Sequence, residues 1–321
     1  MAFFSLFLGS TYIPISSVLN HFVGYELENT SSTFILTNLR LPRVLTAISA
    51  GIGLSVSGLL MQTYFRNSLA GPSILGISTG AGLGVAIVTM SASLFGVDFF
   101  LNGYSLTVAS IFGSVLVLLL VLLLSYRIGS GVLLLIAGVL LSSFIGAFLI
   151  ILQYFTNPED VQKYLLWTMG STTTTSLIDA VLLLVIVIVG VFFTFFLIQP
   201  LNALMLGEKY ASSLGIDLKK TRLLIILITG LLTGSITAFC GPIAFIGLAV
   251  PHLARGIFKS GDHRITLPST ILLGGFLGLV ADFVSRMPWT SGGLPLNTVT
   301  AMVGAPVVIA YILKNSKRGF F

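Results

Sequence analysis

The chain has 321 residues, of which 55% are hydrophobic and 8% are charged, with 16 Lys and Arg against 10 Asp and Glu. A soluble domain carries about 25% charged residues, and a single cysteine with basic residues scattered singly excludes a disulfide scaffold and a nucleic-acid binder. The composition and the net charge of +6 therefore predict an all-α polytopic membrane protein.

Nine stretches are apolar and close to the length of about 20 residues that a helix needs to cross a membrane. They are 41–63, 74–92, 104–125, 132–155, 179–199, 222–240, 243–258, 267–285 and 296–313. Residues 1–9 are a tenth candidate, too short to span alone and without the basic start of a signal peptide. We interpret them as the end of a truncated first helix, and predict about ten transmembrane helices in a single domain, residues 1–321.

The basic residues predict the orientation, because the cytoplasmic loops of membrane proteins are enriched in Lys and Arg. With residues 11–40 outside and alternating spans, twelve basic residues lie in the cytoplasm and four lie outside. The four are Arg40, Arg43, Lys163 and Arg286. The C-terminus is therefore expected in the cytoplasm.

Small residues recur at a spacing of four, which places them on one helix face and lets helices approach closely in lipid. The rows are Gly76, Gly80 and Gly84; Gly138, Ser142 and Gly146; Gly230, Gly234 and Ala238; and Gly274 and Gly278. They predict a compact bundle, whose helices either pack statically or slide against one another.

A weak inverted repeat is also present. The predicted spans 41–63 and 222–240 cross the membrane in opposite directions. In each, an arginine is followed by one small residue eight positions later and by another twelve positions later. The two sets are Arg43, Gly51 and Ser55, and Arg222, Gly230 and Gly234. This pattern favours a transporter over a membrane enzyme.

Residues for catalysis, metal binding or ion coupling are not evident in the sequence. The three histidines lack metal-ligand spacing, and no Gly-Lys-Ser/Thr phosphate loop occurs. Asp282 is the one candidate for the intramembrane carboxylate that a coupled carrier needs, and its place four residues before Arg286 is typical of an ion pair on a helix surface. Active transport would therefore need an energy-supplying partner that docks on the cytoplasmic side.

The segment 201–216 is the candidate for this docking. Leu204, Ala211 and Leu214 form an apolar pattern, and Gly207 and Gly215 interrupt it, as in two short helices joined by a turn. An exposed amphipathic helix pair fits either a partner's groove or the membrane interface, and the residues leave both open.

Five stretches resemble the permease subunits of the ABC importers for ferric siderophores, haem and cobalamin, vitamin B12 transporter permeases included. They are 39–43 (Leu-Arg-Leu-Pro-Arg), 67–81, 206–215, 241–252 and 304–306 (Gly-Ala-Pro). Two departures are the short first helix and Ser68, which stands where the family has a proline.

The resemblance implies a permease, not an enzyme, that moves a ferric siderophore or haem by alternating access; cobalamin is the alternative substrate, and a stand-alone secondary carrier is a rival function. It also implies that the permease pairs with a second copy of itself or with a homologous permease in the bacterial plasma (inner) membrane. Its further partners would be two cytoplasmic ATPase subunits that bind ATP and Mg²⁺, and an extracytoplasmic binding protein. No cofactor, metal or nucleic acid is expected on this chain.

The same resemblance implies roles for three sets of residues. The ATPase-coupling residues are Leu204, Gly207, Glu208, Ala211, Leu214 and Gly215. The residues that dock the binding protein are Arg40, Arg43 and Arg286, although interfacial snorkelling also explains the first two. The candidate inner gate is Ser130, Gly131 and Val132.

Overall fold

The computed structural model describes residues 30–95, 103–286 and 293–316, and its regular structure there is helical throughout. The elements are α3 (Thr30–Phe34), the π-helix η1 (Ile35–Arg40), α4 (Leu41–Tyr64), the 3₁₀-helix η2 (Pro72–Leu75), α5 (Ile77–Phe95), α6 (Gly103–Arg127), α7 (Gly131–Tyr154), α8 (Pro158–Thr168), α9 (Leu177–Phe195), α10 (Ile198–Met205), α11 (Glu208–Ser213), α12 (Leu218–Cys240), α13 (Ile246–Phe258), α14 (His263–Ser285) and α15 (Leu296–Ser316).

The nine predicted spans inside the described residues all coincide with helices. Six of these helices are long and apolar enough to cross a membrane, and α5, α13 and α15 supply three shorter apolar segments. The predicted tenth span, residues 1–9, lies outside the described residues.

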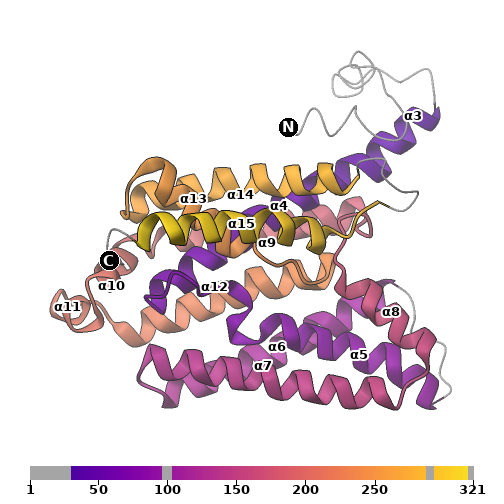
Figure 1. Cartoon of the computed structure of the whole chain (residues 1–321), viewed down its shortest axis with the longest axis horizontal. Helices are drawn as coiled ribbons and strands as arrows, with labels where there is room; N and C mark the ends of the chain where they lie inside the picture. The colour runs from indigo at the N-terminus through magenta and orange to yellow at the C-terminus, as the bar shows by residue number, and fades with distance from the viewer. Residues whose placement is uncertain (1–29, 96–102, 287–292, 317–321) are drawn as a thin grey trace.

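Helix α4 lies at the centre of the bundle and contacts α9, α12, α13 and α14. In Figure 1, α13 and α14 lie on one side of it and α15 crosses in front, while α5, α6 and α7 form the opposite layer beyond α12. Nearly every residue of α4 is buried, whereas α6, α7 and α9 expose long apolar faces. Exposed apolar faces of this length are expected where helices meet lipid or a second membrane subunit.

Most of the predicted small residues lie at close helix contacts, although the tightest contact, between Gly58 and Gly247, was not among them. Gly51 of α4 lies against Gly274 and Gly278 of α14, and Gly80 and Gly84 of α5 lie against α6. Gly146 is the exception, because a Cβ atom placed on it would meet no atom within 4 Å. The inverted repeat stays a prediction, although α4 and α12 do run in opposite directions (Figure 1).

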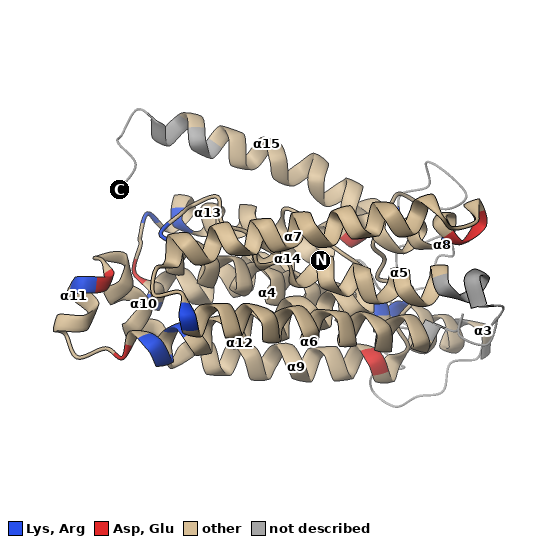
Figure 2. Cartoon of the chain, turned by 90° about the horizontal axis from the view of Figure 1, so that it is seen from below, with Lys and Arg blue, Asp and Glu red and all other residues tan. Residues whose placement is uncertain are grey.

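Charged residues gather at the two ends of the bundle, and the long middle carries almost none (Figure 2). We call the end that carries α10 and α11 the α10 end, and the opposite end the α8 end. This arrangement is the one a membrane imposes, because charges are costly in its hydrocarbon layer. The chain is therefore a multi-pass membrane protein.

The structure corrects the predicted outer loop 11–40, because α3 and η1 continue α4 back through residues 30–40 and the first apolar span begins at Ile35. It also contains a helix at the α8 end that was not predicted. Helix α8 has two acidic residues, Glu159 and Asp160, in its first turn and Pro158 at its start, all of which favour a helix N-terminus. It was missed because it is too short and too polar for a membrane span. Helix α9 also ends earlier than predicted, at Phe195, because a turn separates it from α10.

Candidate functional sites at the two ends of the bundle

At the α10 end, segment 201–216 forms two short helices, as predicted. Gly207 joins α10 to α11 with φ +115°, and Gly215 follows α11 with φ +82°. Both are backbone conformations that favour glycine. Asp217 then caps α12 by accepting hydrogen bonds from the amides of Lys219 and Lys220, and these bonds lower the pKa of its carboxyl group.

The apolar side chains of this pair divide into two sets. Leu204 and Ala211 are buried against the chain's own core, so the structure does not present them to a partner. The exposed apolar side chains at this tip are Met205, Leu206, Tyr210 and Leu214. The predicted pattern therefore contained both the anchors and the exposed surface, and spacing alone could not separate them.

Polar contacts fix α10 to the start of α14. Asn202 donates a 2.7 Å hydrogen bond to Asp262, and its Oδ1 accepts one from the backbone amide of His263. The His263 ring lies 2.7 Å from Asn202 Oδ1 and 2.8 Å from the hydroxyl of Thr63 near the end of α4. A movement of α10 would therefore act on α4 and α14 together.

Arg222, the fifth residue of α12, is buried and holds the end of α6. Its Nη1 donates to the carbonyl oxygens of Ile128 (2.6 Å) and Ser125 (3.3 Å), and its Nη2 donates to that of Gly129 (2.6 Å). The Ser125 carbonyl lies in the last turn of α6, where intrahelical partners are lacking, and the other two belong to the residues that follow the helix. The guanidinium also lies 5.9 Å from the centroid of the Tyr64 ring.

The predicted gate lies next to one predicted coupling residue. Gly131 begins α7, and a Cβ atom placed on it would lie 3.7 Å from Oε1 of Glu208 in α11 and 3.8 Å from Cζ of Tyr64. Ser130 precedes α7 and Val132 is exposed. The structure therefore brings Glu208 and the start of α7 together, with Arg222 beside them.

At the α8 end, two of the three predicted docking arginines meet one carboxylate. Arg43 Nε lies 2.7 Å from Asp282 Oδ1, and Arg286 Nη2 lies 2.8 Å from Asp282 Oδ2. Thr172 also donates to Asp282 Oδ1, at 2.5 Å. The ion pair between Asp282 and Arg286 is confirmed, but its predicted place on the helix surface is wrong, since the Asp282 side chain is 0% exposed.

The arginines themselves are more buried than free docking residues would be. Arg40 lies in η1 and is 6% exposed, while the side chains of Arg43 and Arg286 are 19% and 13% exposed. Burial lowers the pKa of Arg286; Asp282 opposes this shift, and the charges of Arg43 and Arg40 add to it. Arg43 and Arg286 thus form one ion-pair cluster with Asp282, and the charge of Arg40 acts on Arg286.

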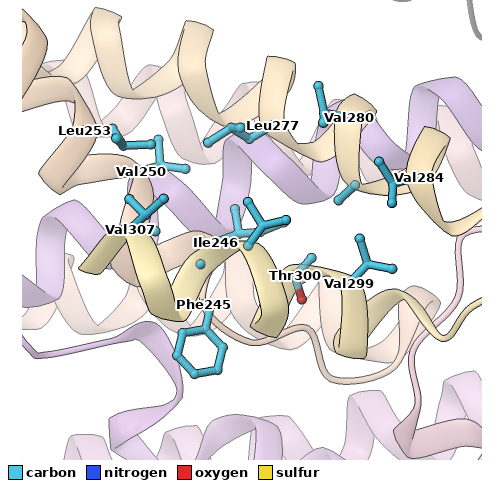
Figure 3. Close-up of a pocket in the computed structure, with 14 residues that line it drawn as sticks. Phe245, Ile246, Val250, Leu253, Leu277, Val280, Val284, Val299, Thr300 and Val307 are labelled. Atoms are coloured by element: carbon cyan, nitrogen blue, oxygen red, sulfur yellow. The ribbon is translucent and has the colours of Figure 1, made fainter. Parts of the chain in front are cut away.

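Two pockets among the described residues are apolar. One of about 60 Å³ lies between α13, α14 and α15, and Thr300 is its single polar lining residue (Figure 3). A larger one of about 560 Å³ is bordered by α6, α9 and α12, with Ser114 and Ser235 as its polar lining residues. Neither has a charged lining residue, so neither resembles a tight site for a charged ligand.

Several residues that connect these sites were not predicted to do so. Thr172, Tyr64 and Asn202 have no distinctive sequence context, and Arg222 is evident in the sequence only as a basic residue of the repeat. An arginine inside the apolar run of α12 was an available signal, because a charge in such a place needs a buried partner. Its partners, the carbonyls at the end of α6, are about a hundred residues away in sequence and carry no sequence signal.

Comparison with known proteins covers nearly the whole chain. Residues 1–314 match the FecCD transport family. The chain is 32% identical over 336 residues to an ABC transporter permease protein of Methanocaldococcus jannaschii, which covers 99% of this chain and 94% of that protein. It is 35% identical over 315 residues to the vitamin B12 import system permease protein BtuC of Klebsiella pneumoniae, with 98% and 90% covered.

A solved structure agrees with these matches. A metal-chelate type ABC transporter in an inward-facing conformation superposes with a TM-score of 0.83 at 30% identity, over 98% of this chain and 95% of that chain. A 35% identical relative and a family match over residues 1–314 are sufficient to assign the family. The chain therefore belongs to the FecCD transport family and is the permease subunit of an ABC transporter.

Proposed function

We propose that this permease imports a ferric siderophore or haem into the cytoplasm by alternating access, with cobalamin as the alternative substrate. ATP hydrolysis takes place on a separate ATPase subunit that contacts α10 and α11. An extracytoplasmic binding protein delivers the substrate to the α8 end. The permease pairs with itself or with a homologous permease in the bacterial plasma membrane, with its C-terminus on the same side as α10 and α11.

The observation that carries the proposal is the α10–α11 tip. It exposes Met205, Leu206, Tyr210 and Leu214 at one end of the bundle, while Asn202 and His263 connect the same segment to α4 and α14. A segment that is both exposed and connected to the central helices is suited to receive movement from a partner. The metal-chelate and vitamin B12 relatives support the substrate class.

Reconstitution tests the proposal directly. Proteoliposomes that contain the permease, its ATPase and its binding protein are expected to accumulate radiolabelled ferric siderophore or haem when ATP is present. Liposomes with the permease alone are expected to show no uptake, with or without an ion gradient. ATPase-independent uptake would instead identify a secondary carrier, and uptake of cobalamin alone would identify the alternative substrate.

The tip predicts a defined ATPase contact. Tyr210→Ser removes an aromatic side chain that is 50% exposed and is not a member of the buried core, so the fold should be retained. We expect ATPase co-purification with the permease to fall at least several-fold, because aromatic residues contribute strongly to interfaces. Tyr104→Ser, at the opposite end and 71% exposed, is the matched control. Equal co-purification of both variants would contradict the assignment.

The arginine cluster predicts salt-dependent docking of the binding protein. Arg286→Gln removes a charge suited to bidentate carboxylate pairing, so we expect weaker docking and a smaller loss of affinity as salt is raised. The measurement is the Kd of the binding protein for the permease in nanodiscs, at low and high salt. Lys163→Gln, on α8, is the control for charge removal at the same end. Unchanged docking by Arg286→Gln would remove the arginines from the docking site.

A further inference from the structure

Asp282 lies at the junction of three parts of the α8 end. Its Oδ1 accepts hydrogen bonds from Arg43 Nε of α4 (2.7 Å) and from the hydroxyl of Thr172 (2.5 Å), which lies in the segment 169–176 between α8 and α9. Its Oδ2 accepts no aligned hydrogen bond from the described residues and is held by the ion pair with Arg286 alone. One buried carboxylate therefore connects α4, α14 and segment 169–176.

A second contact joins the same segment to α4. The hydroxyls of Thr46 and Thr175 lie 2.8 Å apart, both buried, and Thr175 also donates to the carbonyl of Thr172. Segment 169–176 is thus fixed to α4 at two places, through Asp282 and directly. Because this segment directly follows α8, a movement of the segment would also change the position of α8 on the bundle.

The negative and positive groups of this junction differ in their exposure to solvent. The Asp282 side chain is fully buried, whereas the side chains of Arg43 and Arg286 remain partly exposed. A carboxylate that approaches from outside would reach the arginines and not Asp282. It would compete with Asp282 for the same guanidinium groups, and a buried carboxylate that loses an arginine is strongly destabilised.

We propose that Asp282 is an internal competitor for the acidic residues of the binding protein. When those residues pair with Arg43 and Arg286, Asp282 becomes a buried carboxylate without a counter-ion, and segment 169–176 separates from α4 so that water can reach it. Docking is thereby converted into a change at the α8 end of the bundle. Asp282 acts here as a positioning residue; the proposal rests on the proposed function, in which the arginines meet the binding protein.

A reversible cross-link tests the movement. Thr46→Cys with Thr175→Cys, in a Cys240→Ala background that removes the one native thiol, would fix segment 169–176 to α4 as a disulfide, confirmed by mass spectrometry. We expect the oxidised complex in proteoliposomes to bind the binding protein more weakly than the reduced complex, because docking and separation are coupled, and to lose at least tenfold in ATP-driven uptake. Reduction should restore uptake. Equal uptake by oxidised and reduced protein would overturn the proposal.

A substitution tests the competition separately. Asp282→Asn keeps an oxygen that can accept from Arg43 and Thr172 but removes the charge, so the arginines lose their internal counter-ion. We expect the Kd of the binding protein for the nanodisc-embedded permease to fall several-fold. An unchanged or higher Kd would show that Asp282 orients the arginines or only supports the fold. Failure of Arg286→Gln to weaken docking would instead reject the docking role itself.

Discussion

Gly58→Ala is expected to abolish stable folding of the permease, although it adds a single methyl group. A Cβ atom at Gly58 would overlap the carbonyl oxygen of Gly247 in α13 and lie 2.9 Å from its Cα atom. Both contacts are with backbone, so no side chain can move aside, and α4 and α13 would have to separate. Overpacking of this kind costs about 3 kcal/mol or more, a large part of the stability of a domain.

The measurement is the fraction of detergent-solubilised protein that remains monodisperse after a series of heating steps. Gly146→Ala is the matched control, since it is also a glycine inside a membrane-spanning helix but has open space around its Cβ position. Alanine is the better helix former by about 1 kcal/mol, so this control should be neutral or slightly stabilising. Two equally stable variants would show that α4 and α13 are not in close contact.

Arg222→Gln is expected to reduce ATP-driven transport at least tenfold while leaving membrane insertion intact. Arg222 is buried, and its guanidinium donates to three carbonyls at the end of α6, in the segment that leads into α7. Hydrogen bonds from a charged donor contribute about 1.5–3 kcal/mol each. Without them, the segment between α6 and α7 would lose its fixed position beside Glu208, and movement of α11 would no longer reach the start of α7.

Substrate uptake and ATP hydrolysis should be measured on the same proteoliposomes. We expect the number of ATP molecules hydrolysed per substrate imported to rise, because the loss lies in transmission and not in ATPase docking. Lys219→Gln removes an exposed positive charge from the same helix turn and is the control. A parallel fall of hydrolysis and uptake, with a constant ratio, would assign Arg222 a purely structural role.

The membrane-spanning helices could be predicted because the required property is local. Each span needs a run of apolar residues of sufficient length, and the nine predicted runs inside the described residues all became helices. Helix α8 escaped detection because it lies at the bundle end and does not need to be apolar throughout. The two-helix form of segment 201–216 was also predictable, because glycines with positive φ separate its apolar residues.

The orientation of side chains within these elements could not be predicted. Leu204 and Leu214 belong to the same apolar pattern, yet the first is buried and the second is 59% exposed. A spacing of four between Asp282 and Arg286 is compatible with a surface pair and with a buried one. The structure decides for burial, because Arg43 and Thr172 approach Asp282 from other elements.

The sequence by itself determined that this is a membrane protein, where most of its helices run, and several of the small residues that allow them to approach. These properties depend on the apolar length and side-chain size of each segment, which can be counted along the chain. Only the tertiary structure decided which charges neutralise one another. Arg43 and Asp282 are 239 positions apart, and they become partners only because Gly51, Gly274 and Gly278 bring α4 and α14 into contact.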